Sequence, residues 1–233
     1  MKINFITVCT DNYPLYYAEK ITNRFRSLTS LDMEYFCISD RSSEIKGWAK
    51  PIKPSVETSG WWNKVNLYGP HMPKGWLLYM DIDIVIQKNF DFEIMHTINA
   101  GHELNCISDA IGWMGVKFSS SLMILKSGKF TNVFNAFCKN KEAIEKHPGG
   151  DQVWAGKILK NINFIDDQFP HLKKNLKFDL GEKSGDKFLI PAKLPNENIK
   201  LVDCGGRPKP HELSALNYIK KNWHEVPPMV SNY

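Results

Sequence analysis

Apolar and polar positions alternate along this chain in patterns that predict an ordered succession of strands and helices. Residues 3–9 and 33–38 are short apolar runs rich in β-branched and aromatic residues, which predicts two buried strands. Between them, apolar side chains recur at helical spacing, on a face formed by Leu15, Ala18, Ile21, Phe25 and Leu28. A strand, a helix and a strand at this spacing are typical of an α/β fold with a parallel sheet.

Residues 76–86 are predicted to form a central strand, because they are an apolar run with aromatic and β-branched residues. Two carboxylates, Asp81 and Asp83, interrupt this run. Side chains two positions apart on a strand lie on the same face, so the two would be neighbours. Adjacent carboxylates in an apolar setting need a cation or a polar crevice, and Mg²⁺ or Mn²⁺ suits them as an oxygen-bound ion. The alternative interpretation is a strand that stops at Met80 and is followed by an acidic turn.

The remaining pattern continues to alternate strands with helices. A short helix is expected at residues 61–68, before the central strand. Later strands are predicted at residues 105–108, 119–125, 161–165 and 199–203, and later helices at 129–140, 151–159 and about 211–223. Irregular structure with short strands is expected over 166–198. The chain has no internal repeat, linker or low-complexity segment, so a single domain over 1–233 is predicted.

The composition fits a globular protein and indicates the compartment in which it is expected. Of the 233 residues, 42% are hydrophobic and 24% are charged, and no apolar stretch approaches the roughly 20 residues that span a bilayer. The start lacks the features of a signal peptide, and the five scattered cysteines favour reduced thiols, so a cytoplasmic protein is expected. The net charge of +5 suits an anionic ligand and does not by itself indicate nucleic acid.

Candidate chemistry is spread over several short motifs. The first strand is followed by Thr10 and Tyr13, and Trp-Trp-Asn-Lys-Val at 61–65 precedes Asp-Ile-Asp at 81–83. Then come Ser-Ser-Leu-Met at 120–123, Gly-Asp-Gln at 150–152 and Gly-Arg-Pro-Lys-Pro at 206–210. In this order, over residues 3 to about 212, the motifs resemble the GT-A nucleotide-sugar glycosyltransferases. The closest resemblance is to the retaining, glycogenin-like and bacterial galactosyltransferase-like group (glycosyltransferase family 8).

The resemblance implies a fold and an activity. The fold is a single GT-A (Rossmann-like) domain with a mostly parallel central sheet flanked by helices and a smaller antiparallel part near the acidic motif. The activity is a metal-dependent, retaining transfer of a sugar from a nucleotide-sugar donor, UDP-linked by preference, to a glycan, lipid or protein acceptor. The family's donors leave as a diphosphate, whose growing negative charge a divalent ion stabilises.

The resemblance also implies roles for residues. The donor-binding residues would be Val8, Thr10, Tyr13, Trp62, Lys64, Asp81, Ser120, Arg207 and Lys209. Asp81 and Asp83 would hold Mn²⁺ or Mg²⁺. Asp151 and Gln152 would be the catalytic residues beside the reacting sugar, although an Asp at this point is also a good helix cap.

One position departs from the family pattern. Gly205 stands where the resemblance places the family's metal-binding histidine, and Asp203 and His211, which flank it, are the candidates to replace it. Asp203 lies two positions earlier on the predicted strand and shares a face with Gly205, so it is predicted as the substitute metal ligand. The added negative charge predicts weak metal binding that needs the donor.

Two other functions remain open. A catalytically degenerate protein that binds a nucleotide-sugar or glycan would fit the missing histidine. A sugar nucleotidyltransferase would need a glycine-rich basic loop after the first strand, which residues 8–12 do not provide. The lysines of 173–187 favour a solvated face, with an anionic acceptor or peripheral contact with a membrane surface as the alternatives.

Overall fold

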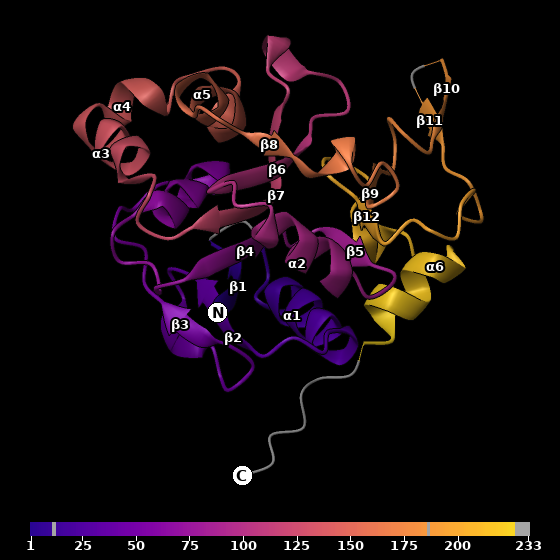
Figure 1. Ribbon diagram of the computed structural model, residues 1–233. Helices are drawn as coiled ribbons and strands as arrows, with labels where there is room; N and C mark the ends of the chain where they lie inside the picture. The colour runs from indigo at the N-terminus through magenta and orange to yellow at the C-terminus, as the bar shows by residue number, and fades with distance from the viewer. Residues whose placement is uncertain (11–12, 186, 227–233) are drawn as a thin grey trace.

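A seven-stranded sheet forms the centre of the computed structural model, which describes residues 1–10, 13–185 and 187–226. Its strand order is β3-β2-β1-β4-β7-β6-β8 (Figure 1). The strands are β1 (Ile3–Val8), β2 (Met33–Ile38), β3 (Lys50–Ile52), β4 (Trp76–Met80), β6 (Leu104–Ser108), β7 (Phe118–Lys126) and β8 (Asn163–Phe164). Only β7 runs against its neighbours, β4 and β6, and the other pairs are parallel. The predicted α/β class with a mostly parallel sheet is confirmed.

Helices cover both faces of this sheet, because consecutive strand residues point to opposite sides. Phe5 packs in a core with α1 (Tyr16–Leu28) and α2 (Asp91–Asn99). Ile6 packs in a second core with α3 (Thr131–Lys139) and α5 (Gly150–Ile158). In Figure 1, α3, α5 and the short α4 (Lys141–Ile144) group together, away from α1 and α2.

Two smaller sheets complete the fold. One has the order β5-β12-β9, from β5 (Ile84–Ile86), β12 (Leu201–Asp203) and β9 (Lys173–Asn175), with β5 antiparallel to β12. The other is the hairpin of β10 (Glu182–Ser184) and β11 (Lys187–Leu189). The first of these sheets is the smaller antiparallel part expected near the acidic motif.

The predicted continuous strand over 76–86 is wrong, and the alternative of a strand followed by an acidic turn is correct. β4 ends at Met80, and the Ile84 N–H donates to the Asp81 carbonyl oxygen at 3.2 Å across a turn. The chain then enters β5, whose partner is β12 rather than a strand of the central sheet. The two aspartates therefore lie in the turn that links the two sheets.

Short helices fill the connections. The 3₁₀ helices are η1 (Ser42–Glu44), η2 (Gly60–Tyr68), η3 (Trp113–Gly115), η4 (Ile165–Asp167) and η5 (Pro210–Glu212). The predicted C-terminal helix at 211–223 is wrong in extent, since only η5, α6 (Asn217–Ile219) and a π-helical turn, η6 (Lys220–His224), form there. β3, α2 and α4 were not predicted. None of the described helices combines the length and apolar character needed to cross a bilayer.

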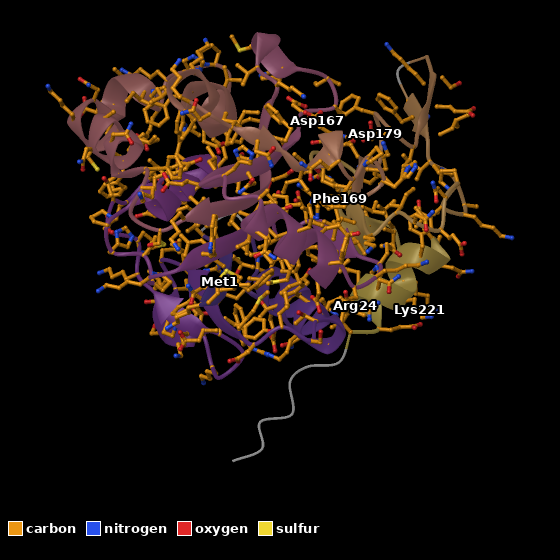
Figure 2. The ribbon with its side chains drawn as sticks, viewed as in Figure 1. Met1, Arg24, Asp167, Phe169, Asp179 and Lys221 are labelled. Atoms are coloured by element: carbon orange, nitrogen blue, oxygen red, sulfur yellow. The ribbon has the colours of Figure 1, made fainter. Side chains whose placement is uncertain are left out.

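The helical turn η6 is hydrogen-bonded to α1. Arg24 donates from Nε to the Ile86 carbonyl oxygen at 3.1 Å, and its guanidinium also donates to the Asn222 side chain. Figure 2 shows Arg24 beside the turn that carries Lys221. These bonds hold α1, β5 and η6 together, and so fix the π-helical turn that follows the Gly205–Lys209 segment and η5.

Candidate functional site

A cavity of about 650 Å³ opens at the carboxyl ends of β1 and β4. Its walls come from the end of β1, the start of α1, η2, the turn after β4 and the segment after β12. In sheets with parallel strands, ligands bind in a crevice at this edge because the strand ends and their loops meet there. The cavity is therefore the candidate site.

Many of the predicted site residues line this cavity. They are Val8, Thr10, Tyr13, Lys64, Asp81, Asp83, Arg207 and Lys209. Other predicted residues are not among the lining residues: Trp62, Ser120, Asp151 and Asp203 are buried, and Gln152 is half-buried. Trp61 and His211, which belong to or flank the motifs singled out above, also line it, and so do three tyrosines that were not predicted: Tyr16, Tyr17 and Tyr79.

The two neighbouring tryptophans face different ways, and Trp62, the one predicted to bind the donor, is the buried one. Trp62 is only 4% exposed and packs against Phe137 and Trp154, with ring centroids 5.6 and 6.2 Å away. Trp61 is 61% exposed and lines the cavity. Neighbouring residues of a 3₁₀ helix point in different directions, so one ring enters the core and the other faces the opening.

Lys64 and Asp81 form one ion pair on the cavity wall. The Lys64 Nζ lies 2.8 Å from Asp81 Oδ1 and donates to the Ser120 Oγ at 3.1 Å, while the Tyr79 hydroxyl donates to Asp81. Burial opposes the charged form of Lys64, but Asp81 and then Asp151 raise its pKa overall. Ser120 thus supports Lys64 from behind rather than meeting a ligand directly.

Lys209 and Asp83 form a second pair on the same wall. The Lys209 Nζ lies 2.5 Å from Asp83 Oδ2 and 5.2 Å from the centre of the Tyr13 ring. Burial, followed by the charge of Asp81, raises the pKa of Asp83 against the opposing effect of Lys209. Lys209 reaches Asp83 from the segment after β12, so this pair ties that segment to the acidic turn before β5, the strand that pairs with β12.

Asp203 does not fit its predicted role as the substitute metal ligand. Its Oδ2 lies 2.6 Å from the Lys173 Nζ, and its Oδ1 accepts the Gly205 N–H at 2.8 Å. Burial alone would raise the pKa of Asp203, but the charge and hydrogen bond of Lys173 lower it overall. Both carboxylate oxygens are already bonded, which explains why this residue is turned away from the cavity.

Lys173 also corrects the interpretation of the lysine-rich segment. Its side chain is 8% exposed and donates to the Ser121 Oγ at 3.0 Å as well as to Asp203. The expectation of a solvated face therefore fails at this lysine. Nothing in a lysine-rich stretch distinguishes one buried lysine, since its partner is a strand that comes later in the chain.

The predicted catalytic pair opens α5 and joins the buried charge cluster. Burial raises the pKa of Asp151, which hydrogen-bonds with Ser120 and lies within the electrostatic reach of Lys64 and Asp81. Gln152 donates from Nε2 to Asp109 Oδ2 at 2.8 Å, and its Oε1 accepts the Ser120 N–H at 3.3 Å. Asp151 is thus more than a helix cap, and both residues lie one layer behind the cavity.

The acidic turn offers part of a metal shell. The oxygens of Asp81 and Asp83 suit Mg²⁺ or Mn²⁺, and both residues line the cavity. Within the described residues, however, no group of three or more His, Cys, Asp or Glu side chains is placed to hold an ion. The residues therefore fit a divalent ion as two ligands whose remaining positions need oxygen atoms from a bound ligand or water.

Comparison with solved structures shows the fold. The apo form of the glycosyltransferase GlyE from Streptococcus pneumoniae TIGR4 aligns with a TM-score of 0.63 and 13% identity, over 97% of this chain and 62% of that one. Another GlyE structure aligns over only 47% of its own length. The galactosyltransferase LgtC, in complex with donor and acceptor sugar analogs, aligns with a TM-score of 0.61 and 10% identity, over 96% of this chain and 97% of that one. No family model and no curated protein matches the sequence. The chain has the fold of the GT-A glycosyltransferases.

Proposed function

We propose that this protein is a glycosyltransferase that moves a sugar from a nucleotide-sugar donor, with UDP as the preferred nucleotide, to a glycan, lipid or protein acceptor. One observation carries the proposal. A single cavity at the carboxyl edge of a GT-A sheet is lined by Asp81 and Asp83 together with Lys64, Arg207 and Lys209. This combination of carboxylates and cations suits a ligand that contains both hydroxyl groups and phosphates.

The cations would stabilise the leaving diphosphate. As the bond between the anomeric carbon and the phosphate oxygen breaks, negative charge grows on the diphosphate, and fixed positive charges stabilise it. Lys64 and Lys209 lie on the cavity wall in positions set by their partners, Asp81 and Asp83. Arg207 is 86% exposed at the rim and pairs with Glu212 at 3.1 Å. Its planar guanidinium suits a phosphate that enters from solvent.

The nucleoside would occupy the end of the cavity nearest β1. Val8, Thr10, Tyr13 and Trp61 line this region, and aromatic rings present faces on which a base or sugar can stack. The Asp81 carboxylate would accept hydrogen bonds from the hydroxyl groups of the ribose. This assignment is supported by the position of Thr10, which accepts a bond from Asn63 of η2 at 2.9 Å and so connects the β1 end to the Trp61 segment.

Asp81 and Asp83 would hold a Mn²⁺ or Mg²⁺ ion, which when bound supplies Lewis-acid stabilisation of the diphosphate. Asp151 and Gln152, the predicted catalytic residues at the start of α5, do not line the cavity and would act on the transferred sugar indirectly, through Ser120 and Lys64. The described carboxylates offer no group in contact with the cavity that is free of a lysine partner, so no enzyme nucleophile is assigned.

A front-face retaining transfer fits this arrangement. The acceptor oxygen forms a bond to the anomeric carbon, the carbon–phosphate oxygen bond breaks, and the acceptor's proton passes to the departing phosphate. The chain's own residues then have two tasks, which are to hold the diphosphate against the lysines and to fix the sugar in the cavity in front of the Lys64–Asp81 pair.

A donor-hydrolysis screen tests the proposal. The protein is incubated with UDP- and GDP-sugars, with and without Mn²⁺, and released nucleotide is measured. Release from a UDP-sugar that depends on Mn²⁺ is expected. Saturable donor binding without release would instead favour the degenerate binding protein, and neither binding nor release of any donor would contradict the proposal.

A further inference from the structure

In the acidic turn at 81–83, Asp83 is already paired with a cation from the protein itself, the side chain of Lys209. Lys209 Nζ lies 2.5 Å from Asp83 Oδ2, with side chains 15% and 11% exposed, and both residues line the cavity. A cation bound to Asp83 through Oδ2 would need the oxygen atom that this ammonium group occupies, and one bound through Oδ1 would lie close to the ammonium. Two positive charges cannot share one carboxylate at such distances without strong repulsion.

Lys209 is better placed to move than the other lysines of the cluster. Lys64 is anchored twice, to Asp81 and to Ser120, and belongs to η2. Lys173 is bonded to Asp203 and Ser121 beneath the cavity. Lys209 comes from the connection between β12 and η5 rather than from a helix or strand, and its Nζ pairs with Asp83 and also contacts Tyr13.

The charge balance of the cluster gives a second argument. Asp81, Asp83, Asp151 and Asp203 are matched by the three lysines Lys64, Lys173 and Lys209, which leaves a single negative charge. A divalent ion would turn that excess into a positive one, whereas a diphosphate arriving alone would make it more negative. Ion and diphosphate therefore each improve the binding of the other.

We propose that Lys209 is the resident counter-ion of Asp83, that a divalent ion must displace it, and that a donor diphosphate promotes the exchange by accepting Lys209. The first half concerns the protein and the ion alone, and the second half rests on the function proposed above. Coupling between two ligands is reciprocal, so the nucleotide must strengthen metal binding by the same factor as the metal strengthens nucleotide binding.

Calorimetric titration of Mn²⁺ into the nucleotide-free protein tests the first half. Lys209→Ala is expected to bind Mn²⁺ about tenfold or more tightly than the unaltered chain, because the competing ammonium is gone. The matched control is Lys117→Ala, which removes the same charge from an exposed lysine–aspartate pair, Lys117 with Asp167 at 3.0 Å. That control should leave Mn²⁺ affinity unchanged. Lys209→Ala with unchanged or weaker affinity overturns the inference.

A second variant and measurement keep the inference testable if Lys209→Ala does not fold. Lys209→Gln keeps a polar side chain of similar length, and the rise in its melting temperature on adding Mn²⁺ should exceed that of the unaltered chain. An equal or smaller rise counts against the inference.

Adding UDP separates the inference from the proposed function. UDP should tighten Mn²⁺ binding to the unaltered chain and should do so less in Lys209→Ala. Tighter Mn²⁺ binding by Lys209→Ala, combined with no effect of UDP on any variant, would support the competition for Asp83. The same result would contradict the use of a UDP-linked donor and the donor half of the inference.

Discussion

Lys173 Nζ lies 2.6 Å from Asp203 Oδ2, and both side chains are 8% exposed. This pair connects the parallel strands β9 and β12 beneath the cavity. Because Asp203 also accepts the Gly205 N–H, the pair fixes the start of the segment that carries Arg207 and Lys209. A buried pair of this kind is sensitive to the loss of either partner, since the remaining charge is left unpaired.

Lys173→Met is therefore expected to lower the free energy of unfolding by about 3 kcal/mol. Asp203→Asn should also destabilise, and the double variant should lose less than the two single losses combined, because it leaves no unpaired charge. Urea denaturation of the four proteins measures this. Strictly additive losses would show that the two side chains do not stabilise one another.

The two neighbouring tryptophans should respond in opposite ways. Trp62→Ala removes a buried ring and should lower the free energy of unfolding by about 3–5 kcal/mol. Trp61→Ala should change it by only about 0.5 kcal/mol, because the ring is exposed, but should weaken UDP binding. Denaturation and calorimetry on both variants check the pattern. Full UDP affinity in Trp61→Ala would remove this ring from the nucleotide site.

A glycine should be needed at position 150 for two reasons, the backbone conformation there and the space beside Trp61. Its φ is +64°, and a Cβ there would lie 2.8 Å from Trp61 Nε1. Gly150→Ala should thus destabilise the protein by about 1 kcal/mol and also weaken UDP binding by moving Trp61. Gly128→Ala is the control, since its φ is +79° but no described atom lies within 4 Å of the added Cβ. Equal UDP affinities in the two variants would contradict a role for the Gly150–Trp61 contact.

Asp91 should make stability depend on pH in the acid range. Burial opposes its charge, but bonds from Thr29 Oγ1 at 2.6 Å, from the Ser30 N–H at 2.7 Å and from Asn89 lower its pKa overall. A carboxyl whose folded pKa lies below the unfolded value of about 3.9 stabilises fully above that value and loses this stabilisation as the pH falls through the folded pKa. Asp91→Asn should therefore unfold more easily by about 2 kcal/mol at pH 7 and by progressively less below pH 4. A difference that is constant across this range would contradict the assignment.

The sequence predicts most of the fold because local periodicity identifies β1, α1, β2, β7, α3 and α5 closely. The prediction of one continuous strand over 76–86 fails at Met80, because residues 84–86 would be equally apolar whether they extended β4 or joined another sheet. Their true partner, β12, lies far along the chain, and no local pattern reveals it. The prediction of a helix at 211–223 fails for a related reason, since contacts such as that of Arg24 with Asn222 shape the turn at Lys220–His224.

The site is predictable in part. The motifs lead to Asp81, Asp83, Lys64 and Lys209, and all four line one cavity. Residue type alone does not tell which of two adjacent tryptophans faces the opening, nor that Lys173 neutralises Asp203. The roles assigned to the site residues, and the single domain over 1–233, stay predictions.

Nucleotide release from a UDP-sugar is the most direct test of the central claim, that Asp81 and Asp83 lie in the donor site of a metal-dependent glycosyltransferase. Release is measured with and without Mn²⁺ for the unaltered chain and for Asp83→Ala, with circular dichroism as the check on folding. The account predicts Mn²⁺-dependent release by the unaltered chain and none by a correctly folded Asp83→Ala. Undiminished release by Asp83→Ala would contradict it.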